Sequence, residues 1–175
     1  MIEKGEPLSV IYRSTLVIVL GFIVAGTAMT QETSNRARAW VAVGAGGSMP
    51  TSGGDAITNI AQLVYQKQTL HAAFRVLLLH DIDRNTNEIG EIGPLWGKTR
   101  KHAWGRTSLA TGFSWVGFYR CPGDDDECST LGLPLVAEAT IGPRFAGLGI
   151  QAFGNLNGTA SFAGAVLFLQ LGRLR

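Results

Sequence analysis

The sequence predicts an all-β fold, namely an eight-stranded antiparallel up-and-down transmembrane β-barrel that follows an N-terminal signal peptide. Two observations support this prediction. Segments of about ten residues alternate with period two, which is the pattern of a β-strand with two different faces. Neither face is rich in charge, since only 16% of the 175 residues are charged and 23 are glycine. One face therefore suits lipid, and the other suits a narrow interior that its own side chains fill.

The alternation is clearest near the C-terminus, in three segments at residues 133–141, 145–154 and 162–171. In the first segment one face is wholly apolar, whereas the other carries Glu138. Turns are expected at Gly142-Pro143-Arg144 and at Asn155-Leu156-Asn157-Gly158, because glycine, proline and asparagine favour tight turns. This block predicts the last three strands of the barrel.

Five more strands are expected upstream, at residues 38–45, 57–66, 70–79, 88–99 and 104–120. Arg75 lies in the middle of the third of these, where facing lipid would cost roughly 2–4 kcal/mol, so it identifies the inner face. Segment 88–99 has the weakest pattern, because Pro94 and glycines interrupt it. We include it because a bacterial single-chain barrel has an even number of strands.

The N-terminal residues 1–28 are expected to be a cleaved signal peptide. Lys4 and Arg13 precede an apolar run at 16–25, and small residues follow it at 26–28. A spanning helix would need about 20 apolar residues, so an uncleaved anchor is the less favoured alternative. The barrel domain is then expected at 36–175.

An eight-stranded barrel has an interior just wide enough for side chains. A lone charge in such a water-poor lumen is costly, so we expect the polar inner residues, Arg75 and Glu138 among them, to form one hydrogen-bonded network. A proton or ion path is the functional alternative. The predicted network residues are Arg38, Gln62, Arg75, Arg106, Glu138, Gln151 and Gln170. The aromatic residues expected to fill the rest of the lumen are Phe145, Phe153, Phe162 and Phe168.

Two cysteines, Cys121 and Cys128, flank an acidic loop at 122–127. In an exported protein such a pair most simply forms a disulfide that closes a hairpin loop. The four consecutive acids could bind a hard cation such as calcium, but they lack the alternating spacing of a calcium loop. A solvated acidic turn is therefore favoured, and neither a metal site nor a cofactor is predicted.

The three histidines are the obvious candidates for a general base. His71 is expected in the lumen, His80 at the outer rim and His102 in a turn. A lipid-modifying enzyme would need a histidine and a serine together on the lipid-facing wall, and only His80 could be so placed. No serine lies within two residues of His80, so the partner would have to come from another strand. We therefore do not predict an enzyme.

Residues 36–175, with the closing block GLPLVAEATIGPRFAGLGIQAFGNLNGTASFAGAVLFLQLGRLR, resemble the small outer-membrane β-barrel proteins of Gram-negative bacteria, in the size class of OmpA and OmpX. The resemblance implies a monomer in the cell outer membrane, with outer-membrane lipid and the barrel-assembly machinery as partners. This chain ends Leu171-Gly172-Arg173-Leu174-Arg175, whereas that class commonly ends on an aromatic residue.

The expected function is structural or surface-interactive, without an open pore. The net charge of +2 gives no electrostatic reason to expect nucleic acid as a partner. Polar loops at 81–87 and 121–130 are expected outside the cell, where an extracellular ligand would bind. The alternative is a soluble exported lipocalin-like binding barrel, whose outer face would have to be polar.

Overall fold

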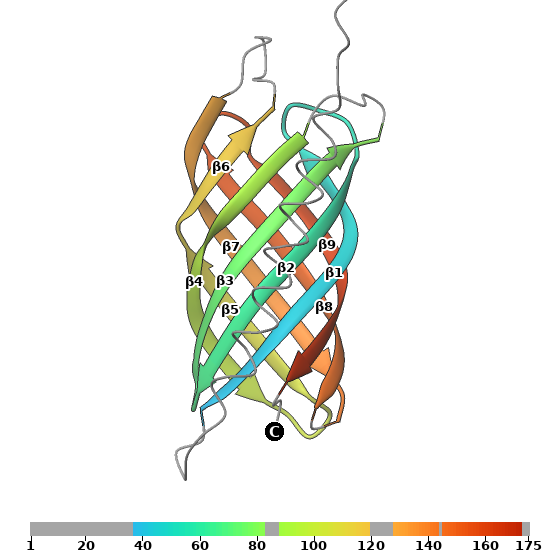
Figure 1. Cartoon of the computed structure of the whole chain (residues 1–175), viewed down its shortest axis with the longest axis vertical. Helices are drawn as coiled ribbons and strands as arrows, with labels where there is room; N and C mark the ends of the chain where they lie inside the picture. Colours follow the sequence, from blue (N-terminus) through green and yellow to red (C-terminus); the bar gives the residue numbers. More distant parts are fainter. Residues whose placement is uncertain (1–36, 83–87, 120–127, 144, 173–175) are drawn as a thin grey trace, which may run out of the picture.

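The computed structural model describes residues 37–82, 88–119, 128–143 and 145–172. They form one closed antiparallel sheet in which each strand pairs with its neighbour in the sequence and the first strand pairs with the last (Figure 1). Among the described residues, no helix is long and apolar enough to cross a membrane. The strand segments are β1 (Arg38–Pro50), β2 (Ala56–Lys67), β3 (Leu70–Asp81), β4 (Glu88–Lys101), β5 (Arg106–Gly112), β6 (Ser114–Phe118), β7 (Cys128–Ile141), β8 (Ala146–Asn157) and β9 (Phe162–Gly172).

The nine segments make eight strands, because β5 and β6 follow one line on either side of Phe113. The register against β4 continues unchanged across Phe113, which places Pro94 opposite it. On the other side, the register against β7 places Pro134 opposite Gly112. A proline has no N–H to donate to a neighbouring strand, so the ladder is weakened on both sides at this point. The predicted all-β, eight-stranded closed barrel is confirmed, and it includes the weakly patterned strand β4.

The two ends of the barrel differ in their connections. We call the end where β1 begins and β9 ends the terminal end, and it has short turns (Figure 1). We call the opposite end the loop end. Its connections join β1 to β2, β3 to β4, β6 to β7 and β8 to β9. Gln68 makes a two-residue turn at the terminal end with φ of 56°, a left-handed conformation. The turn expected at 155–158 is wrong, because β8 continues to Asn157 and the chain turns at 158–161 instead.

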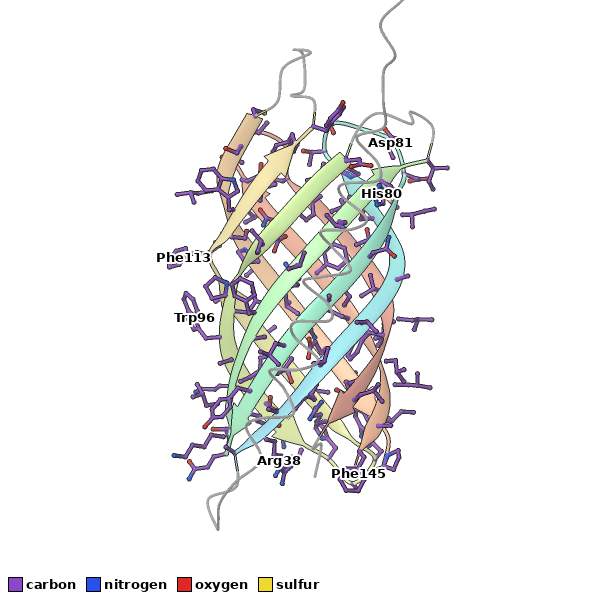
Figure 2. The ribbon with its side chains drawn as sticks, in the orientation of Figure 1. Arg38, His80, Asp81, Trp96, Phe113 and Phe145 are labelled. Carbon is purple, nitrogen blue, oxygen red and sulfur yellow. The ribbon has the colours of Figure 1, made fainter. Side chains whose placement is uncertain are left out.

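The two faces of the wall have opposite character. Large apolar side chains are exposed along the outside, whereas the inside holds a buried mixture of apolar and polar groups. Figure 2 shows Trp96 and Phe113 projecting from the outer wall, where their ring centroids are 5.4 Å apart. One expected lumen residue is wrong: Phe145 is 66% exposed at the terminal end, because it precedes β8 in the turn (Figure 2). Phe153, Phe162 and Phe168 are buried inside.

Strand β1 closes the barrel against β9, with Val41 opposite Leu171. The seam depends on glycine, because the two backbones approach closely there. A Cβ atom on Gly46 would lie 2.0 Å from the carbonyl oxygen of Ala165, and one on Gly44 would lie 2.4 Å from that of Leu167. The glycine-rich stretch of β1 therefore serves the closure of the sheet.

Candidate functional site

The first polar cluster of the lumen is built on a buried ion pair between β3 and β4. Arg75 Nη2 donates to Glu91 Oε1 at 2.5 Å, and the two side chains are 0% and 1% exposed. Asn155 Nδ2 donates to Glu91 Oε2 at 3.1 Å and lies 2.7 Å from Ser114 Oγ. The Arg75 guanidinium also lies 5.8 Å from the ring centroid of Phe153. Both charged side chains are thus buried away from water, with the Phe153 ring beside the guanidinium.

The second cluster surrounds Glu138 on β7. Gln62 Nε2 and Gln151 Nε2 each donate to Glu138 Oε1 at 2.7 Å, and Gln151 Nε2 also lies 3.2 Å from Gln62 Oε1. Gln62 is directly opposite Arg75 in the β2–β3 register, so this cluster adjoins the first one. The single network expected for Arg75 and Glu138 is therefore wrong in its connections: both lie inside, but the hydrogen bonds among the described residues place them in adjacent, separate clusters.

The third cluster lies near the terminal end, where Arg106 Nη2 donates to Gln170 Oε1. The Arg106 guanidinium sits over the ring of Trp40, 3.7 Å from its centroid, in a cation–π contact. The ring of His71 follows, 6.4 Å from that of Trp40. Trp40 is 2% exposed, so its indole is packed inside the lumen.

The charges of the lumen balance. Arg75 and Arg106 are buried together with Glu91 and Glu138, so the inside holds equal numbers of fixed cations and anions among its described residues. Toward the terminal mouth a recess of about 330 Å³ is lined by Arg38, Lys101, Arg106 and Gln170 among others. Arg38 is half-buried at this mouth rather than deep in the lumen.

Two members of the lumen clusters, Glu91 and Asn155, were not anticipated from the sequence. Glu91 lies in β4, whose proline and glycines obscure the alternation, and Asn155 lies in an apparent turn sequence. A usable signal does exist for Glu91. Glu91 is an even number of residues away from Leu95 and Thr99, which are also buried. The alternation of inward- and outward-facing residues therefore continues across Pro94.

His80 on the outer wall pairs with an acid rather than with a serine. Its Nδ1 lies 3.2 Å from Glu88 Oε1, and both side chains are about one-third exposed. Ser129, which lines the same part of the outer wall, is on β7, and β4 and β6 stand between β7 and β3. Neighbouring strands are about 4.8 Å apart, so these two residues are roughly 14 Å from each other, too far to act as a nucleophile and its base.

The other two histidines lie elsewhere in the barrel. His71 is fully buried in the lumen, and His102 at the terminal end lies with Nε2 2.9 Å from Thr107 Oγ1 and stacks on Trp104 at 5.0 Å. Within the described residues, no group of three or more His, Cys, Asp or Glu side chains could hold a metal ion.

Several predictions concern residues outside the described ranges. These are the signal peptide at 1–28, most of the loops at 81–87 and 121–130, and the last three residues. Cys128 begins β7 and is not a free cysteine, but Cys121 lies outside the described residues. The disulfide between them stays a prediction.

A closed eight-stranded barrel with an apolar outer wall and a filled, charge-balanced lumen is an outer-membrane-type barrel. A comparison with solved structures finds the same fold. The crystal structure of Neisserial surface protein A (NspA) matches with a TM-score of 0.61 and 10% sequence identity, over 81% of this chain and 99% of that one. At that identity the likeness shows the fold alone. No protein-family model matches the chain, and no curated protein matches it.

Proposed function

We propose that this protein is a monomeric, non-conducting barrel of the bacterial outer membrane, in the OmpA and OmpX size class, with a structural or surface-interaction role and no catalytic activity. One observation carries the proposal: the Arg75–Glu91 pair lies across the lumen side of β3 and β4 with 0% and 1% exposure. A water-filled channel would hydrate these charges. Trp40, Leu77 and Phe168 add large buried side chains to the same interior.

The apolar outer wall supports the proposed location. Leu109, Leu135 and Leu167 are 69%, 47% and 71% exposed, and a lipid environment covers such side chains at no cost. A soluble lipocalin-like barrel would expose them to water. The chain would reach the outer membrane through a cleaved signal peptide at 1–28 and would be inserted by the barrel-assembly machinery.

The loop end is proposed to face the outside of the cell. It carries the longer connections and the described rim acids Asp55, Asp81 and Glu88, whereas the terminal end has the short turns typical of the periplasmic side. An extracellular partner would then bind at the loops 81–87 and 121–130. Deleting residues 122–127 should leave the barrel folded while weakening such binding to intact cells.

Conductance measurements test the proposal. The folded protein, recognised by a shift in gel mobility on boiling, is reconstituted into planar bilayers, with a sixteen-stranded porin as the positive control. We expect no steady single-channel steps, because an eight-stranded barrel has room only for its own side chains. Stable conductance well above that of the bare bilayer would overturn the proposal and make the protein a small channel.

A further inference from the structure

A groove of about 980 Å³ crosses the outer wall from the β2–β3 turn over β4, β5, β7 and β8, in the half nearer the terminal end. Its floor consists of small side chains, and its sides consist of Leu109 and Ile150, which are 69% and 51% exposed. The strand registers explain the depression, because small residues from neighbouring strands fall in two adjacent rows. The floor residues are Thr107, Ala137, Ala139 and Ala152.

Basic side chains occupy one edge of this groove. The register places Lys98 opposite Leu109 and Arg100 opposite Thr107, and both cations are exposed on the outer side of β4. Lys101 lines the groove as well. Lys98 and Arg100 lie near the terminal end of β4, whereas Ala152 lies in the middle of β8, so the groove rises from the cations toward the centre of the wall.

The charge of the terminal end has one sign. Apart from Arg75 in the lumen, the described lysines and arginines lie at this end; they are Arg38, Lys67, Lys98, Arg100, Lys101 and Arg106. The described acids lie elsewhere: Asp55, Asp81 and Glu88 are at the loop end, and Glu91 and Glu138 are buried inside. Among the described residues, no exposed acid lies at this end to compete for Lys98 and Arg100.

We propose that this groove is a binding site for one anionic phospholipid, whose phosphate is held by Lys98 and Arg100 while an acyl chain lies on the alanine floor. The site deepens the proposed role of membrane lipid as a partner, and it rests on the membrane location. An apolar groove with two neighbouring cations at one end matches a ligand that has a negatively charged headgroup and a long apolar chain. A free phosphate would leave the apolar part uncovered.

The headgroup contact is tested with the folded full-length protein in detergent, by native mass spectrometry of retained lipid. Phosphatidylglycerol is compared with phosphatidylcholine of the same acyl chains. We expect preferential retention of one phosphatidylglycerol, weakened about tenfold or more in Lys98→Gln/Arg100→Gln, since each cation near an anionic lipid contributes about fivefold to tenfold. Lys67→Gln removes a charge from the same end outside the groove and should behave as the unaltered protein. Equal retention of both lipids by the unaltered protein, or an unaffected double variant, would overturn the proposal.

The acyl-chain contact is tested by filling the floor. Ala137→Phe/Ala152→Phe should weaken phosphatidylglycerol retention, whereas Ala45→Phe, on the outer face of β1, should not. Both substitutions face lipid, and the heat-dependent gel shift verifies that each variant is folded. If inorganic phosphate displaces the lipid and the filled groove binds as well as the open one, the site is a phosphate site and the lipid proposal is wrong. None of these outcomes changes the conductance result, so the two proposals fail separately.

Discussion

Replacing Arg75 with methionine should destabilise the barrel more than most single substitutions can. The guanidinium is fully buried and its Nη2 lies 2.5 Å from Glu91 Oε1, so its removal leaves a carboxylate inside the wall with Asn155 as its remaining donor among the described residues. Breaking one partner of a buried ion pair costs about 3–5 kcal/mol, because an uncompensated charge remains in a medium of low dielectric constant.

The double replacement Arg75→Met/Glu91→Met should recover most of that loss. Both desolvated charges are then gone, and apolar side chains of similar volume fill the space, a change that is often close to neutral. The coupling between the two positions should therefore amount to several kcal/mol. As a matched control, Val76→Met changes the next residue on β3, which faces outward, and should alter stability by no more than about 0.5 kcal/mol.

The measurement is reversible urea unfolding in lipid vesicles, followed by tryptophan fluorescence. Free energies of unfolding are compared for the unaltered protein, both single variants, the double variant and the control. A loss below about 1 kcal/mol for Arg75→Met would show that water reaches this charge and would refute the sealed lumen. A double variant no more stable than Arg75→Met would refute the pairing itself.

Two further predictions use other features. Gly93→Ala should lower the free energy of unfolding by about 1–3 kcal/mol in the same assay, because the added Cβ would lie 2.1 Å from the carbonyl oxygen of Phe113. Gly117→Ala is the control, since its Cβ would meet open space and should leave stability unchanged. Equal stability of the two variants would contradict this packing. Thiol labelling of intact, non-reduced protein should find neither Cys121 nor Cys128 free. Full labelling of both would reject the disulfide.

The fold could be predicted from the sequence because the residues of a strand themselves indicate which of its faces is inside. Arg75 on β3 and Glu138 on β7 cannot face lipid, so each fixes the parity of a whole strand independently of its neighbours. A one-residue slip would move every side chain of the strand to the wrong face. The inner and outer residues of these two strands therefore follow from the sequence without the strand pairing.

The partners of these charges could not be predicted in the same way. Which inner residues meet depends on the register between strands, and Glu91 reaches Arg75 only because Leu77 stands opposite it in the β3–β4 pairing. The residues around Asn155 favour a turn, yet Asn155 lies within β8 and its amide is buried against Glu91. The prediction that Phe145 faces the lumen is wrong because Phe145 lies in a turn, where the alternation of a strand does not determine the direction of a side chain.

The seam between β1 and β9 also has a consequence for the folding rate. It joins Val41 to Leu171, nearly opposite ends of the described chain, so the loop-closure entropy of this contact is the largest in the barrel. Contacts of such sequence separation slow folding, and until this one forms the sheet keeps two open edges with unpaired N–H and C=O groups. Loss of β9 would thus leave an aggregation-prone sheet instead of a smaller barrel.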